Sequence, residues 1–149
     1  MNGIEEFVER FGIIGEEDGM SRTAGRMLAL LLSAGAPLSF SEIAKRLQVS
    51  RGGVSTNVRL LEEMGMVERV SRPGDRQDYF QFPADGWHRQ IERQMARERK
   101  ARQCAETLLG SGADLSPVAR QRVSYMADLL KASEAKNRET LKLMSSSDA

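Results

Sequence analysis

The 149-residue chain has little cysteine, histidine or aromatic residue, and its charges nearly cancel. Its single cysteine, Cys104, excludes an intramolecular disulfide bond. Because His88 is also alone, we expect no cysteine- or histidine-based metal site. Aromatic residues make up only 5% of the chain while methionine occurs eight times, which favours a helical protein over a β-sandwich. The net charge of +1 provides no general attraction for nucleic acid, so a nucleic-acid-binding surface would need its basic groups on one face.

Long apolar runs and catalytic motifs are also missing. No run approaches the roughly 18 apolar residues that a membrane helix needs. The first residues include Glu5 and Glu6, where a signal peptide would be basic. We therefore expect a cytoplasmic protein without membrane contact. The sequence has no serine–histidine–aspartate set with a usable base, no phosphate-binding loop and no dinucleotide fingerprint, so we expect no enzyme activity, catalytic residue or cofactor.

Apolar periodicity predicts four helices in the first 64 residues. Residues 4–14 and 20–32 repeat their apolar positions at helical spacing, and Gly12 and Gly15 predict a soft end for the first helix. Ser39 and Glu42 have the spacing of a capping box, which predicts that a short helix starts after Ser39, with Ile43, Ala44 and Leu47 facing inward. After a tight turn, Ser50 is a suitable N-cap for a helix from Arg51 to about Met64.

The period then changes to that of a β-hairpin. Residues 66–71 and 78–82 alternate as strands do, and Pro73-Gly74-Asp75 between them is typical of a hairpin tip. A long charged helix is predicted over residues 85–109, and a last helix starts with Pro117 at its first position, before a frayed tail over 145–149. We predict a mainly α protein with a β-hairpin wing: a winged helix-turn-helix domain over 4–83 and a helical dimerisation region over 84–149.

The helix that begins at Arg51 is the predicted DNA-reading helix. At 100° per residue, its apolar residues fall on one side and face the core. The opposite side carries Ser55, Thr56 and Arg59, which are short hydrogen-bonding groups and a bidentate cation of the kind that reads base edges. Asn57, on the flank, is predicted to pair with adenine or with a phosphate.

Two further groups are predicted to contact the DNA backbone and the minor groove. Ser50, Arg51 and Gly52 form the start of the reading helix, where bare N–H groups and the helix dipole accept a phosphate. Arg72 and Arg76 flank the hairpin tip, from which an arginine can enter the minor groove, and Asp75 or Asp78 would orient Arg76. The region from residue 45 to residue 76 carries seven basic and four acidic side chains, a local surplus of positive charge.

Three stretches resemble the GbsR branch of the MarR-type transcriptional regulators: residues 38–47, residues 49–55 and the Pro-Gly-Asp-Arg wing within residues 73–80. The segment from Arg22 to Arg26, with the leucines after it, also fits that branch. The resemblance covers residues 4–83. It implies a homodimer that binds a palindromic DNA site, with terminal helices at the dimer interface. It also implies a small-molecule effector in some members, choline or betaine among them.

Several residues have two interpretations. Trp87 is either an effector-binding ring, suited to a cationic ligand, or an aromatic wedge between the two regions. Phe80 and Phe82 are interpreted as core residues, and Cys104 as a buried structural thiol. For the whole chain, a homodimeric DNA-binding regulator, acting as a repressor, is the leading hypothesis. The alternative is a winged-helix module that binds proteins and not DNA.

Overall fold

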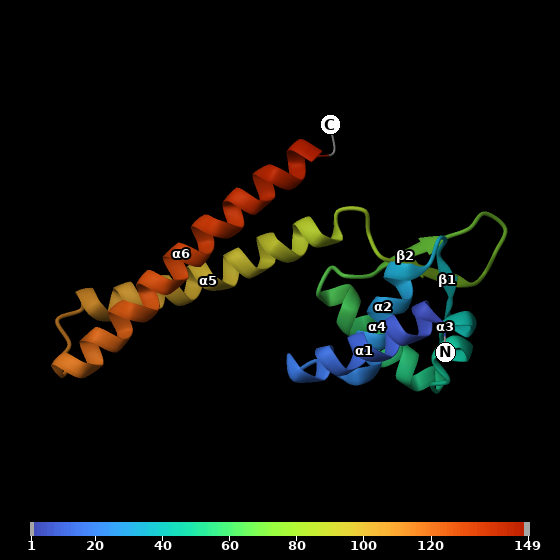
Figure 1. The fold of residues 1–149 in the computed structure, drawn as a ribbon, viewed down its shortest axis with the longest axis horizontal. Coiled ribbons are helices and arrows are strands. Elements are labelled where there is room, and N and C mark those ends of the chain that lie inside the picture. The colour runs from blue at the N-terminus through green and yellow to red at the C-terminus, as the bar shows by residue number, and fades with distance from the viewer. Residues whose placement is uncertain (1, 148–149) are drawn as a thin grey trace. The chain divides into compact units, whose positions relative to one another are not determined.

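The structure is a computed structural model that describes residues 2–147. It divides into two compact units, with the boundary between Gly86 and Trp87; we describe each unit by itself (Figure 1). The first unit contains three short strands and four helices. In chain order these are α1 (Gly3–Glu17), α2 (Arg22–Ser33), β1 (Leu38–Ser39), α3 (Phe40–Leu47), α4 (Arg51–Glu63), β2 (Glu68–Ser71) and β3 (Asp78–Gln81). The second unit is formed by α5 (Gly86–Gly110) and α6 (Pro117–Ser147), α5 beginning at the boundary.

Helices α1 and α2 approach closely because glycines line their contact. Gly12 and Gly15 are buried inside α1 and do not soften its end, so that prediction was wrong. Gly25 of α2 faces them: a Cβ atom there would lie 2.9 Å from the carbonyl oxygen of Phe11 and 3.1 Å from the Cα of Gly12. Without side chains at these positions, the two backbones can pack against each other.

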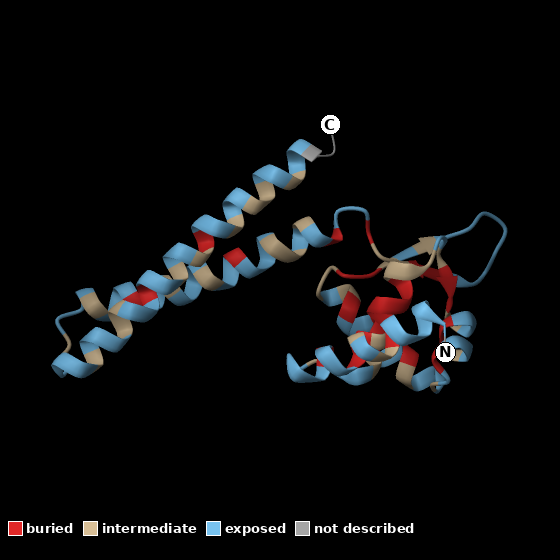
Figure 2. Ribbon diagram, viewed as in Figure 1, coloured by how far each residue is buried: buried red, intermediate tan, exposed pale blue. Residues whose placement is uncertain are grey.

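The core of the first unit joins all four helices to the hairpin (Figure 2). The largest side chains that are almost completely buried include Met27, Ile43, Leu61 and Phe80, which come from α2, α3, α4 and β3 respectively. Phe80 is thus a core residue, as predicted, and Phe82 packs against the same core half-buried. The core fixes α4 and the hairpin to one body.

The sheet has three strands in the order β1-β3-β2, and both pairings are antiparallel. The hairpin strands were predicted, but β1 was not, because two residues are too few to show alternation. In the β2–β3 register, Arg69 lies opposite Phe80 and Val70 lies opposite Tyr79. Since alternate residues share a face, Arg69, Phe80 and Asp78 lie on one face of the hairpin.

Helices α3 and α4 begin at the predicted caps. The Ser39 hydroxyl accepts from the Glu42 N–H, and Glu42 in turn accepts from the Ser39 N–H at 2.7 Å. This second bond is the main reason why the pKa of Glu42 is lowered. Between the two helices, Gln48 adopts a left-handed conformation (φ 53°), and α4 then starts with Ser50 as its N-cap. These caps set the tight turn between α3 and α4.

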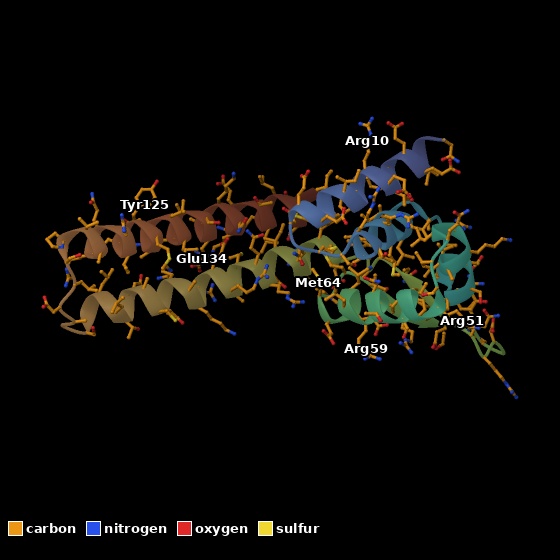
Figure 3. The ribbon with its side chains drawn as sticks, turned by 90° about the horizontal axis from the view of Figure 1, so that it is seen from below. Arg10, Arg51, Arg59, Met64, Tyr125 and Glu134 are labelled. Carbon is orange, nitrogen blue, oxygen red and sulfur yellow. The ribbon has the colours of Figure 1, made fainter. Side chains whose placement is uncertain are left out.

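The second unit is a helical hairpin with a charged residue in its packed interior. Glu134 of α6 is only 6% exposed, and Figure 3 shows it between α5 and α6. Its carboxylate accepts from Arg99 at 2.8 Å, from Arg138 at 2.9 Å and from Arg102 at 3.2 Å. A single buried carboxylate with three arginine partners satisfies the condition under which a charge can be buried.

Two expectations for this unit were wrong. Cys104 is exposed, because the buried side chains of α5 include Met95 and Ala105, and Cys104 lies on another stripe of the helix. The tail that was expected to fray continues α6 as far as Ser147; the last two residues lie outside the described range. As predicted, Ser116 accepts from the Ala119 N–H ahead of Pro117. Within residues 2–147, no helix is long and apolar enough to span a membrane.

Candidate nucleic-acid interface

One face of α4 is buried and the opposite face carries exposed polar side chains. Val54, Val58 and Leu61 are at most 3% exposed and lie in the core, as predicted. Ser55, Thr56 and Arg59 lie on the other side and are exposed. Figure 3 shows Arg59 pointing away from the helices of the first unit. The helix therefore offers two hydroxyl groups and a guanidinium group to a partner outside the molecule.

The N-terminus of α4 is arranged so that it can accept an anion. The Ser50 hydroxyl accepts from the Gly53 N–H at 3.0 Å. Gly52 is exposed and has no side chain to cover the first turn. The Arg51 guanidinium lies over the Phe40 ring, 5.6 Å from its centre, at the same end of the helix. The positive end of the helix dipole and a nearby arginine both favour a phosphate here.

Asn57 does not lie with the exposed residues, and the prediction of a base or phosphate contact from it does not fit the structure. It is 9% exposed. Its side-chain amide donates to the Gly53 carbonyl oxygen at 2.7 Å, and its oxygen accepts from the Ser21 hydroxyl at 2.6 Å. Because Ser21 is also the N-cap of α2, Asn57 ties α2 to α4. Its two hydrogen bonds therefore lie inside the first unit and not on the exposed face with Ser55 and Arg59.

The wing is organised by Tyr79, which holds two residues of the hairpin loop. The Tyr79 hydroxyl donates to the Asp75 carboxylate at 2.6 Å. This bond is the main cause of a lowered pKa at Asp75 and of a raised pKa at Tyr79. The Arg72 guanidinium lies over the Tyr79 ring, 3.8 Å from its centre, and donates to the Pro37 carbonyl oxygen at 3.4 Å. Gly74 supplies the positive φ of 78° that the turn requires.

Arg76 lies exposed in this loop. The side chains expected to orient it are used elsewhere. Asp75 is bonded to Tyr79, and Asp78 pairs with Arg69 at 3.1 Å. The structure thus brings Arg72 and Arg76 to the wing, and holds Arg72 through Tyr79.

The contact between wing and helix was missed in the sequence. Arg69 of β2 pairs with Asp78 of β3 and also with Glu62 of α4, at 3.2 Å. Its guanidinium lies 5.4 Å from the centre of the Phe80 ring. The sequence shows Arg69 only as one more basic residue, because its two partners lie on different elements. The one available signal was the alternation along β2. Glu68 and Arg69 lie on opposite faces of the strand, and Arg69 shares its face with Phe80.

Trp87 and His88 lie in the first turn of α5. Trp87 is 44% exposed, and the Nε2 of His88 lies 3.4 Å from Glu92. A role for Trp87 in effector binding stays a prediction. Within residues 2–147, no three histidine, cysteine or acidic side chains are grouped so that they could hold a metal ion.

A capped helix after a tight turn, with polar groups on its exposed face and a hairpin with arginines beside it, defines a winged helix-turn-helix domain. Comparisons with known proteins give the same class of domain. Residues 18–78 match the model of the MarR family. Over 128 residues, the chain is 34% identical to the HTH-type transcriptional regulator MmpR5 of Mycobacterium tuberculosis, a match that covers 85% of this chain and 78% of that protein.

A solved structure, described as the crystal structure of a transcriptional regulator, has a TM-score of 0.82 and 32% sequence identity. The match covers 97% of this chain and 99% of that one. The chain therefore belongs to the MarR family, a family of transcriptional regulators and not of enzymes. It is a DNA-binding transcriptional regulator, and the alternative of a winged-helix module that does not bind DNA is set aside.

Proposed function

We propose that the protein acts in the cytoplasm as a homodimeric repressor that binds a palindromic operator through α4 and the wing. The observation that carries this proposal is the exposed polar face of α4, which lies beside an arginine-bearing wing on one rigid body. Ser55, Thr56 and Arg59 are the residues we assign to base edges in the major groove. Arg59 is the main candidate for a bidentate contact with guanine.

The N-terminus of α4 and the wing are assigned to the DNA backbone and the minor groove. Ser50, Arg51 and Gly52 would hold a phosphate at the positive end of the helix dipole. Arg76 would enter the minor groove from the exposed tip, because a narrow groove attracts a cation. Arg72, stacked on Tyr79, would lie against the neighbouring backbone. These contacts position the protein, whereas the α4 contacts select the sequence.

Exposed apolar residues support the homodimer. On α1, Ile4, Ile13 and Ile14 are 44–54% exposed. On α6, Val118, Tyr125 and Leu129 are 55–72% exposed and recur at helical spacing. Apolar stripes of this kind mark interfaces, and regulators of the MarR family bind DNA as dimers. Two α4 helices in one dimer would meet the major groove about one helical turn apart.

We also assign the chain to the GbsR branch of the family and propose that it binds a small-molecule effector. The Pro-Gly-Asp-Arg wing over residues 73–76 supports the GbsR branch, in which some members respond to a small molecule. A cationic effector would suit the partly exposed ring of Trp87. Effector binding would change the spacing of the two α4 helices and so the affinity for the operator.

Selection from a randomised duplex pool tests the proposal. Purified protein is incubated with the pool at about 150 mM salt, and the bound DNA is sequenced. We expect a two-fold symmetric motif whose half-sites are about 10 base pairs apart. The matched variant is Arg59→Ala, which should relax the selection at one position of each half-site. Enrichment of an asymmetric motif, or unchanged selectivity in the variant, would contradict the assignment.

A further inference from the structure

We infer that Arg69 is a positioning residue for DNA recognition: it holds the wing at a fixed angle to the reading helix and does not itself bind DNA. The inference rests on the proposed roles of α4 and the wing. Arg69 is the described residue that forms ion pairs with both of them, through Glu62 of α4 and Asp78 of β3. This pair of contacts is called the wing brace below.

The two ends of one guanidinium group form the brace. The Nη1 of Arg69 lies 3.1 Å from the Asp78 carboxylate, and its Nη2 lies 3.2 Å from the Glu62 carboxylate. The flat guanidinium lies over the ring of Phe80, which is 1% exposed and therefore fixed in the core. The planar fork lets two separate nitrogens each reach a carboxylate while the group lies flat on the ring. A lysine ammonium is a single point charge.

The charges of the brace argue against a direct contact between Arg69 and a phosphate. One positive charge is shared by two carboxylates, so the group as a whole carries a negative charge. A phosphate that approached Arg69 would also approach Glu62 and Asp78. By contrast, no carboxylate is paired with Arg59 or Arg76 among the ion pairs that the structure shows within residues 2–147.

The wing brace lies between the base-reading face of α4 and the hairpin. A hollow between α4 and the hairpin is lined by Ser55 and Arg59 on one side and by Arg69 and Asp78 on the other. The brace therefore spans the gap between the proposed base-reading residues and the strand that leads to the wing. Contacts in two grooves of one duplex require that helix and wing keep a fixed separation, because a misplaced wing weakens its own groove contact while α4 keeps its contacts.

The free energy of the two ion pairs limits how much DNA affinity can be lost when the wing brace is broken. Its three side chains are 32–52% exposed, and exposed ion pairs stabilise a fold only slightly. A contact can bias the wing position only by its own free energy. We therefore expect a loss of roughly two- to fivefold in affinity for the selected operator, with a small change in unfolding temperature.

Three single variants test the brace. For each of them, net charge alone predicts unchanged or tighter DNA binding, whereas loss of the brace predicts weaker binding. Arg69→Lys keeps the charge but loses the fork. Glu62→Gln and Asp78→Asn remove a negative charge, which by itself would strengthen DNA binding. The inference predicts weaker binding in all three, with an unchanged dependence of affinity on salt. Glu17→Gln is the control, since it removes the same charge from an exposed position of α1 in the same unit, and its affinity should not fall.

A double-mutant cycle locates the effect on the wing. The loss caused by Arg69→Lys should disappear when Arg76→Ala has already removed the wing contact, and should persist when Arg59→Ala has removed the helix contact. Wild-type affinity in Arg69→Lys, tighter or unchanged binding in Glu62→Gln or Asp78→Asn, or a salt dependence that falls with Arg69 would overturn the inference. If the wild-type protein selects no duplex at all, the proposed function fails instead.

Discussion

Replacing Gly25 with alanine tests how closely α1 and α2 approach each other. The new Cβ atom would lie 2.9 Å from the Phe11 carbonyl oxygen and 3.1 Å from the Gly12 Cα, both of which are backbone atoms. The helices must therefore move apart, at a cost of about 1–3 kcal/mol for overpacking. Alanine recovers about 1 kcal/mol through its better helix propensity. We expect a net loss of about 1–2 kcal/mol in the free energy of unfolding, with the overpacking term at the upper end of its range.

Thermal unfolding followed by circular dichroism measures this loss. For a chain of this size, the change corresponds to a midpoint lowered by about 3–6 °C, measured at one fixed protein concentration because a dimer's midpoint depends on it. Gly3→Ala is the matched control. It lies in the first turn of α1, and nothing lies within 4 Å of its new Cβ. Equal midpoints for the two variants would show that the contact between α1 and α2 is looser than described.

Four further outcomes follow from the described contacts. Arg59→Ala should weaken binding to the selected operator by about 1–3 kcal/mol while leaving non-specific binding unchanged, as competition titrations would show. Arg76→Ala should weaken binding to all sequences and reduce the slope of log affinity against log salt by about 1. Asn57→Ala should lower the stability to denaturant by about 1–3 kcal/mol, because it leaves the Ser21 hydroxyl without its acceptor, but should not change the selected motif. The Arg99 hydrogen bond is the main cause of the lowered pKa of Glu134. The ionised Glu134 therefore stabilises the fold fully above the ordinary glutamate pKa, and this stabilisation is lost as the pH falls through the lowered pKa. Glu134→Gln should reduce the loss of folding stability at acid pH, as denaturant unfolding at several pH values would show.

The fold was largely predictable because its signals are local. The capping box of Ser39 and Glu42 and the N-cap of Ser50 each depend on residues a few positions apart, and they place the starts of α3 and α4 at the observed residues. Alternation identified β2 and β3 for the same reason. The two-residue strand β1 carries no periodicity, and only its pairing with β3 makes it a strand.

The errors concern contacts between distant residues. Asn57 is polar and lies on the helix that is proposed to read DNA, but its partner Ser21 lies 36 positions earlier in the chain. Gly12 and Gly15 are typical of a helix end, and only the approach of Gly25 explains them inside α1. Cys104 has the helical spacing of a core residue, yet α6 packs against another side of α5. In each case, tertiary packing determines the role of the residue.

The intramolecular partners of Arg26 and Arg69 affect how the protein would search a genome. Arg26 pairs with Glu9 at 2.7 Å, and Arg69 pairs with two carboxylates. These cations are not available to random phosphates, and the net charge of +1 adds little long-range attraction. We expect brief residence on unrelated DNA and a modest dependence on ionic strength. The longer residence on the operator would then come mainly from base contacts. Few molecules in a cell would be bound to unrelated DNA.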